Sequence, residues 1–182
     1  IRRMIKMIKD KNIILRPLRK NDLEKLAKWE TPEIRGRYQE FHFKSIVNLE
    51  KKFNENGFIS DDLNLLMVEL NTGERVGLLF INFKREGIVN LGLVITRSEK
   101  RGQGLGKKIL TLILEHLFNN YPLVRVEADT DVENEAAQKV LTSVGFRNEG
   151  RLRNYRFHHG NWHDSFMFSI TNEEYNEVLN NE

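Results

Sequence analysis

The sequence predicts an α+β fold in which helices cover a mixed, mostly antiparallel sheet. Three strand-like segments follow one another at residues 63–70, 75–83 and 88–95 with short turns between them, which is typical of an antiparallel meander. Residues 105–144 then alternate helix, strand and helix, an order that allows a parallel crossover in the same sheet. The chain has 182 residues, and at roughly 150 residues per domain we expect one domain over residues 1–182.

The first part of the chain is expected to supply one strand and two helices. Residues 13–18 are apolar and β-branched, which favours a strand. Asn21 is expected to cap a helix that ends at Pro32, because the apolar side chains between them fall at helical spacing and proline breaks a helix. A second helix is predicted over residues 45–53, with Gly57 at its exit.

The second part of the chain is expected to contain two helices, a strand between them and a closing hairpin. In chain order these are a helix over residues 105–118, a strand over 123–128, a helix that starts at the capping-box spacing of residues 130–133 and ends at Gly145, and strands over 146–157 and 164–170. Residues 158–161 are expected to form the hairpin loop, which would leave His158 and His159 in solvent.

Composition and charge exclude several classes of protein. The chain has no Cys, which excludes disulfides and thiolate zinc sites, and its five His show no HExxH or HxH spacing, so no metal is expected. The net charge is only +3, with Lys and Arg interleaved among Asp and Glu, so no nucleic-acid partner is expected. No apolar run approaches the roughly 18 residues of a membrane span. Residues 1–11 lack the apolar region of a signal peptide, so we expect a cytoplasmic protein, not bound to membranes, with a flexible basic extension at this end.

A glycine-rich loop, Arg101-Gly102-Gln103-Gly104-Leu105-Gly106-Lys107, lies between a predicted strand and a predicted helix. Alternating glycines remove Cβ atoms where a backbone must approach a ligand closely, and N–H groups at a helix start favour an anion. A Walker A loop would need glycine at Arg101, and a dinucleotide fingerprint would need it at Lys107. We therefore predict a phosphate or pyrophosphate site of another kind, and a glycine turn that binds nothing is the alternative.

Together with its neighbours, this loop resembles a known family. The R-x-x-G-x-G pattern from Arg101 to Gly106 is similar to the acyl-CoA pyrophosphate motif of the GNAT superfamily of N-acetyltransferases. Residues 134–150 resemble the second half of that family's core. Residues 160–164 resemble the closing hairpin of its RimJ/RimL-like branches, the ribosomal-protein alanine and spermidine N-acetyltransferases. The resemblance covers nearly the whole chain.

The resemblance implies a GNAT-like sheet in which two parallel strands, 88–95 and 123–129, splay apart and hold acetyl-CoA as the co-substrate. The strand backbone would pair with the pantetheine arm, the loop N–H groups would bind the pyrophosphate, and a helix would add an amide and an amine. The residues implied in this site are Leu93, Val94, Ile95, Arg101, Gly102, Gln103, Gly104, Leu105, Gly106, Lys107, Asn134 and Lys139. Two of them have simpler alternatives, because Asn134 suits a helix cap and Lys139 an ordinary solvated lysine.

The catalytic groups are where the chain departs from the family pattern. Many members have a glutamate base on the strand that here holds Asn90, and an amide cannot accept a proton at neutral pH. The positions of the family's tyrosine acid and of a serine correspond to Leu141 and Ala137, which cannot donate a proton. Tyr155, on the first strand of the closing hairpin, is therefore the candidate proton donor, with a purely structural tyrosine as the alternative.

The acceptor is expected to be a primary amine. Glu33 and Glu40 lie between the early helices and are candidates to bind a cationic acceptor. Roughly a tenth of an α-amine is neutral at pH 7, against about one lysine-like amine in a few thousand, so a site without a strong base favours a protein or peptide N-terminus. A polyamine or other small amine, and a non-catalytic acyl-CoA-binding module, are the alternatives, and a homodimer stays open.

Overall fold

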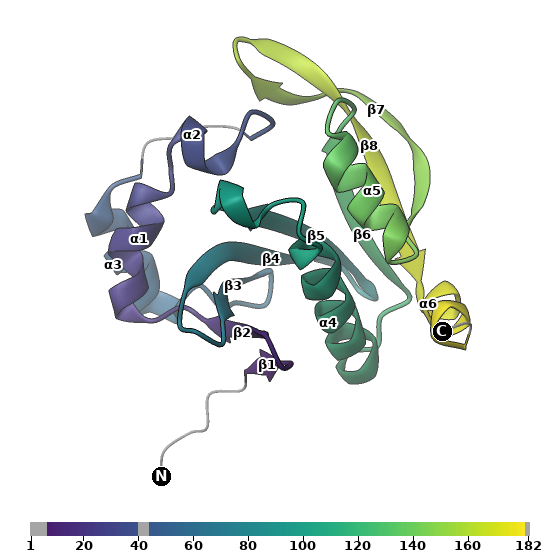
Figure 1. Cartoon of the computed structure of the whole chain (residues 1–182), viewed down its shortest axis with the longest axis horizontal. Helices are drawn as coiled ribbons and strands as arrows, with labels where there is room; N and C mark the ends of the chain where they lie inside the picture. The colour runs from purple at the N-terminus through teal and green to yellow at the C-terminus, as the bar shows by residue number, and fades with distance from the viewer. Residues whose placement is uncertain (1–6, 40–43, 181–182) are drawn as a thin grey trace.

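The computed structural model describes residues 7–39 and 44–180 of the chain. Within that part, eight strands form one sheet in the order β1-β2-β3-β4-β5-β6-β8-β7, with helices on both faces (Figure 1). The strands are β1 (Ile8–Lys9), β2 (Ile13–Pro17), β3 (Leu63–Leu70), β4 (Arg75–Arg85), β5 (Ile88–Ile95), β6 (Arg125–Asp131), β7 (Arg147–His158) and β8 (Asn161–Thr171). The helices are α1 (Leu23–Lys28), α2 (Pro32–Arg35), α3 (Ile46–Asn56), α4 (Leu105–Asn120), α5 (Glu135–Ser143) and α6 (Asn172–Asn180).

Neighbouring strands in this sheet are antiparallel except for one parallel pair, β5 and β6, so the predicted fold class is confirmed. The parallel ladder joins residues 88–91 to residues 125–128. Strand β6 pairs with β8 along its whole length, and beyond Ala128 it continues to Asp131 without pairing to β5. The two parallel strands therefore part at this point, and this is the splay that the resemblance implied.

Two apolar cores lie on opposite faces of the sheet, because side chains alternate along each strand. Helices α4 and α5 pack on one face, in a cluster that includes Leu91 and Ala128. Helices α1 and α3 pack on the other face, where Met67 of β3 is fully buried. By the same alternation, Asn90 and Asp129 lie on the face opposite α4.

The first helices differ from the prediction at both ends. Helix α1 is preceded by Asp22 and not by Asn21, because the Asp22 carboxylate turns inward to accept hydrogen bonds from the Arg19 N–H and the Arg16 guanidinium. Pro32 begins α2 and does not end α1. Proline suits the first helical position, where its missing N–H would have had no helical partner.

The flexible extension expected over residues 1–11 is wrong for its last residues. Ile8 and Lys9 form β1, which pairs with β2, and Ile8 packs against the first core. Residues 1–6 lie outside the described part of the chain. Among the helices that the structure describes, none is long and apolar enough to cross a membrane.

Two expectations for the second half are also wrong. Strand β6 runs through the predicted capping box to Asp131, and α5 begins after Asn134. The closing hairpin turns on two residues, His159 and Gly160, with φ angles of +50° and +79°. Positive φ at both positions is typical of a tight hairpin turn whose twist matches that of its strands. Strand β7 therefore extends to His158, which is buried and not exposed in a loop.

Candidate active site

The last residues of β5 present one backbone edge beyond the parallel ladder. Leu93, Val94 and Ile95 pair with β4 on one side. On the other side the pairing of β5 with β6 has ended at Leu91. Backbone N–H and C=O groups on that side are placed to pair with an extended molecule, as in strand addition.

The glycine loop enters α4 through two residues in the left-handed conformation. Gly102 and Gly104 have φ angles of +72° and +75°, and a Cβ at either would meet no atom within 4 Å. The first helical hydrogen bond of α4 runs from the Lys108 N–H to the Gly104 carbonyl. The N–H groups of residues 105–107 therefore point out of the helix start, next to the exposed Lys107 and Lys108 side chains. This arrangement suits an anion.

The Arg101 side chain turns back from the loop and joins two elements. Its guanidinium donates to the Ile95 carbonyl at 2.7 Å and to the Ile34 carbonyl at 2.9 Å. It thereby connects the end of β5 with α2. Gln103 Nε2 donates to the Glu99 carbonyl at 2.6 Å, which holds the loop against the turn before it.

Three positions at or on helix α5 that the sequence analysis singled out, Asn134, Lys139 and Leu141, differ in their contacts and burial. Asn134 caps the helix, since its Oδ1 accepts from the Ala137 N–H at 3.3 Å. Lys139 is 79% exposed and pairs with Glu135 at 3.4 Å. Leu141, at the family's tyrosine position, is buried in the core beneath α4 and α5. These contacts are the simpler alternatives for Asn134 and Lys139, and cofactor binding by either residue stays a prediction.

Gly77 of β4 lies against the β5 segment that the pantetheine arm is expected to meet. A Cβ at Gly77 would lie 2.4 Å from the Val94 carbonyl oxygen, closer than real Cβ contacts. We expect Gly77→Ala to displace β5 at this point, to lower the free energy of unfolding by about 1–3 kcal/mol and to weaken CoA binding. The matched control is Gly92→Ala, whose Cβ would lie 3.6 Å from Phe80, an ordinary contact. Denaturant unfolding and CoA titration test both variants, and equal losses would contradict the expectation.

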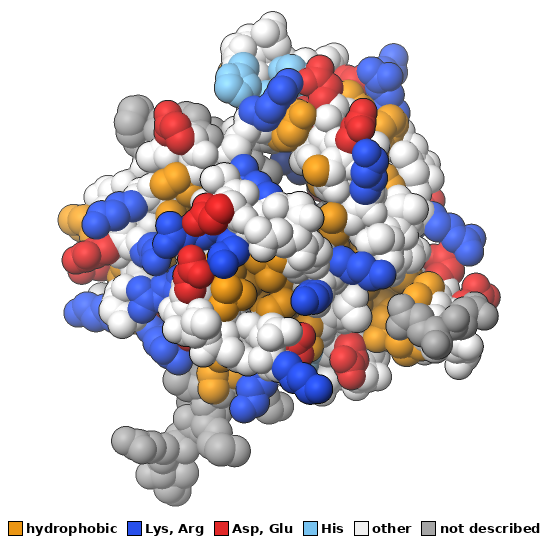
Figure 2. All heavy atoms as spheres, in the orientation of Figure 1, with side chains coloured by type: hydrophobic (Ala, Val, Ile, Leu, Met, Phe, Trp, Pro, Cys, Tyr) orange, Lys and Arg blue, Asp and Glu red, His pale blue; other side chains and the backbone are white. Residues whose placement is uncertain are grey.

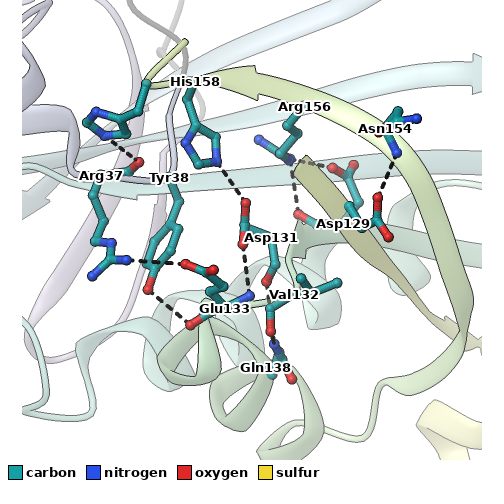
Figure 3. Close-up of polar contacts among 12 residues, drawn as sticks. Arg37, Tyr38, Asp129, Asp131, Val132, Glu133, Gln138, Asn154, Arg156 and His158 are labelled. Atoms are coloured by element: carbon teal, nitrogen blue, oxygen red, sulfur yellow. Dashed lines mark hydrogen bonds and ion pairs between the residues drawn. The ribbon is translucent and has the colours of Figure 1, made fainter. Parts of the chain in front are cut away.

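The carboxylate of Asp129 lies where β5 and β6 part. Asn90 Nδ2 lies 3.4 Å from Asp129 Oδ1. Arg156 of β7 pairs with Asp129 Oδ2 and also donates to the Asp129 carbonyl at 3.3 Å (Figure 3). Asp129 is the first residue of β6 after the parallel ladder ends. Asn90, at the position where many family members have glutamate, therefore has the acidic side chain of Asp129 beside it on the adjacent strand.

Tyr155 of β7 is close enough to this carboxylate to respond to its charge. Partial burial raises the pKa of Tyr155 above its ordinary value of 10.0, and the negative charge of Asp129 raises the pKa further. The side chain is still 46% exposed. The phenol is thus protonated at neutral pH and able to donate a proton.

Residues 36–39, after α2, reach across to the second half of the sheet. The Tyr38 hydroxyl donates to the Glu133 carbonyl at 3.0 Å, and the Arg37 guanidinium pairs with the Glu133 carboxylate at 3.2 Å (Figure 3). His159 Nε2 lies 3.1 Å from the Arg37 carbonyl oxygen. The loop is thereby fastened both to the start of α5 and to the tip of the closing hairpin.

Of the two glutamates predicted to bind a cationic acceptor, the structure describes only Glu33. Glu33 lies on α2 and is exposed. Hydrogen bonds from its own backbone N–H and from the Thr31 hydroxyl lower the pKa of Glu33, so it carries a negative charge at neutral pH. Glu40 lies outside the described residues.

Sequence reasoning missed the polar side chains that converge on β6. The segment Arg125–Asp131 alternates charged residues with Val, Ala and Thr, and this period of two was the available signal for one charged face. For Arg156, His158 and His163 the sequence holds no comparable signal. Their approach to β6 depends on the strand order β6-β8-β7 and on the two-residue turn.

Comparisons with known proteins agree with this arrangement. The model of the Acetyltransferase (GNAT) domain family matches residues 12–147. The chain is 24% identical over 169 residues to the uncharacterized N-acetyltransferase p20 of Bacillus licheniformis. This alignment covers 90% of this chain and 94% of that protein. It is also 24% identical over 166 residues to the spermidine N(1)-acetyltransferase of Escherichia coli (strain K12), with 90% and 88% of the two chains covered.

A solved structure shares the fold. The spermidine N-acetyltransferase from Vibrio cholerae, crystallised in complex with CoA and spermine, superimposes with a TM-score of 0.81 at 21% identity. The match covers 91% of this chain and 99% of that one, so the two chains share the overall fold.

Proposed function

Because the chain belongs to the GNAT acetyltransferase family and is therefore an acetyltransferase, we propose that its acceptor is a small aliphatic amine of the polyamine class. The observation that carries this proposal is the Asp129 carboxylate beside Asn90, where β5 and β6 part. One oxygen of this carboxylate, Oδ2, already pairs with Arg156, and the other, Oδ1, can hold a cationic amine by a charge-assisted hydrogen bond. Similar proteins from Escherichia coli and Vibrio cholerae are named spermidine N-acetyltransferases, which supports the same class of acceptor.

Acetyl-CoA fits the geometry along β5. We propose that the N–H groups of residues 105–107 hold its pyrophosphate and that the backbone of Leu93–Ile95 pairs with its pantetheine arm. Gly102 and Gly104 support this placement, because side chains at either position would occupy the open space in front of the helix start. We propose that the pantetheine arm runs from the glycine loop back along β5 and ends where β5 and β6 part. The thioester at its end then lies on the same side of the sheet as Asn90 and Asp129.

The side chains at this point fit the steps of acetyl transfer. The cationic amine first gives one proton to solvent. The neutral amine nitrogen then attacks the thioester carbonyl, the C–N bond forms and the C–S bond breaks. The nitrogen gives up a second proton as the thiolate leaves and takes one up, so the protons balance. We propose that Asp129 orients the amine. We propose that Tyr155, whose raised pKa keeps it protonated at neutral pH, returns a proton to the thiolate.

A protein N-terminal α-amine, which the sequence alone favoured, becomes the second candidate. That preference depended on the lack of a carboxylate at Asn90, and Asp129 now stands beside that position. The contacts of Arg37 and Tyr38 with Glu133 also bridge the acceptor side of the sheet. A bridge there suits a short, slender acceptor better than a polypeptide.

The test compares the wild-type protein with Asp129→Asn, using spermidine and a Ser/Ala N-terminal peptide as acceptors. Loss of one charge-assisted hydrogen bond of about 1.5–3 kcal/mol predicts a fall of about 10–100-fold in kcat/KM for spermidine, with unchanged CoA affinity. The matched control is Asp61→Asn, an exposed acid in the loop before β3, which should behave as wild type. Acetylation of the peptide but not of spermidine, or an unaltered Asp129→Asn variant, would contradict the proposal.

Tyr155→Phe tests the proposed proton donor. General acid catalysis by one group contributes about 10²–10⁴-fold, so we expect kcat to fall by about 100-fold while the Kd for CoA stays unchanged. Tyr121→Phe serves as the control, because Tyr121 is 37% exposed at the far end of α4, where it packs on Phe83. Unchanged turnover in Tyr155→Phe would remove Tyr155 from the mechanism.

A further inference from the structure

A cluster of Asp131, His158 and His163 lies near the turn of the closing hairpin. Each residue offers one ligand atom, and these atoms all lie within 4.8 Å of one another. Asp131 Oδ2 lies 2.8 Å from His158 Nε2, and the two imidazoles stack with centroids 3.7 Å apart. We propose that these three residues form a binding site for a divalent metal ion of the zinc class, distinct from the site of acetyl transfer.

The cluster contains buried polar atoms that lack partners. His158 Nδ1 and His163 Nε2 are buried with no hydrogen-bond partner among the described residues. His158 as a whole is 7% exposed. A buried polar atom without a partner costs free energy, so a group that satisfies both nitrogens stabilises the folded chain. Imidazole nitrogens in this state are potential metal ligands.

The charge of Asp131 points to a cation. Its carboxylate is fully buried and accepts hydrogen bonds from the Glu133 N–H, at 2.8 Å, and from His158. A buried carboxylate is costly without a compensating cation. A divalent ion supplies that charge next to the two imidazoles.

The donor set suits zinc chemistry. Two imidazole nitrogens and one carboxylate oxygen are a common ligand combination for Zn²⁺, and a water molecule fills the fourth position. Each imidazole binds the ion through one unprotonated nitrogen, because metal binding requires unprotonated ligand atoms. The parallel rings must also fan apart. His163 is only partly buried, which leaves its ring able to turn out of the stack toward the ion.

The backbone that carries the cluster is already fixed by strand pairing. Asp131 lies on β6, His163 on β8 and His158 on β7, and these strands are neighbours in the sheet. The Tyr38 ring meets the His158 ring edge-on at 6.3 Å. Figure 2 shows histidine side chains gathered at this end of the molecule. The ion would tie the hairpin to β6 and brace the 36–39 loop that rests on it.

The test is a titration of the metal-free full chain with Co²⁺, followed by the visible absorption of the bound ion, and then displacement by Zn²⁺. We expect one ion per chain. His158→Gln and Asp131→Asn should each weaken binding by at least about tenfold. The matched control is His159→Gln, which removes the adjacent, exposed imidazole and should leave binding unchanged. Circular dichroism verifies that each variant is folded, and His163→Gln replaces any buried variant that is not.

Two outcomes would overturn the proposal. Wild-type protein that takes up neither Co²⁺ nor Zn²⁺ at one ion per chain leaves the cluster as a hydrogen-bonded pair of imidazoles and a carboxylate. Equal weakening in His159→Gln and His158→Gln assigns the ion to surface histidines instead. The experiment measures metal binding and not acetyl transfer, so its result does not depend on which acceptor the protein uses.

Discussion

Gly104→Glu is expected to weaken CoA binding by about 10²–10⁴-fold, because it removes about two charge-assisted hydrogen bonds of about 1.5–3 kcal/mol each. Gly104 immediately precedes α4, and nothing occupies the space that its side chain would enter. The next three residues, 105–107, have N–H groups at the helix start, ahead of the first helical hydrogen bond from the Lys108 N–H. A glutamate there puts a carboxylate where the pyrophosphate is expected, and the helix start then interacts with the protein's own anion.

The control must separate this effect from backbone strain. Gly73, in the turn between β3 and β4, also has a positive φ, +84°, and open space around a Cβ. Gly73→Glu therefore carries a similar conformational cost and the same added charge, away from the loop. Isothermal titration of both variants with CoA measures the difference. Normal CoA affinity in a folded Gly104→Glu protein would contradict the placement of the pyrophosphate.

Asp22→Ala is expected to give the largest loss of stability, about 3–5 kcal/mol, because it removes one of the two carboxylates, Asp22 and Glu69, that pair with the buried Arg16 guanidinium. The Asp22 side chain is fully buried and pairs with Arg16 at 2.8 Å and with Arg75 at 2.9 Å. Arg16 is itself only 1% exposed. For a domain of this size the loss corresponds to a fall in Tm of about 6–20 °C. These pairs also fasten the start of α1 to β2 and β4.

The control for Asp22→Ala is an exposed ion pair. Glu135 and Lys139 are 77% and 79% exposed, and their atoms lie 3.4 Å apart. Glu135→Gln should cost less than about 1 kcal/mol, since solvent screens an exposed pair. Denaturant unfolding compares the two variants. Similar losses would show that the buried network contributes no more than a surface pair.

The same network predicts an acid dependence of stability. Burial alone would raise the pKa of Asp22 above 3.8, but the hydrogen bonds from Arg16 and the Arg19 N–H outweigh burial and lower it. Because the folded pKa lies below the unfolded one, the contribution of Asp22 is complete above about pH 5 and falls away toward pH 2. The difference in unfolding free energy between wild type and Asp22→Ala should shrink over that range. A difference that stays constant would contradict the assignment.

Local patterns in the sequence were sufficient for much of the fold. Strands β3 and β5 form over the predicted residues, because an apolar run between tight turns specifies a buried strand by itself. The position of the glycine loop before α4 was equally readable, since a loop between a strand and a helix depends on neighbouring residues. The hairpin register was not readable, because it depends on His159 adopting a positive φ that a residue with a Cβ rarely takes.

The missed part of the site depends on long-range pairing. Asn90 and Asp129 are 39 residues apart in the chain and meet only because β5 and β6 are parallel neighbours. Asp131, His158 and His163 come from three strands whose spatial order differs from their order in the sequence. Periodicity places a side chain on a face, but it does not say which strand lies beside it.

Thiol release from acetyl-CoA measures the proposed acetyl transfer to a small aliphatic amine. The acceptor panel contains spermidine, Ser/Ala N-terminal peptides, free amino acids, an aminoglycoside and an internal-lysine peptide, with CoA binding measured on the same sample. We predict thiol release with spermidine at a higher kcat/KM than with any peptide. CoA binding without release from any acceptor, or release with peptides alone, would contradict the claim.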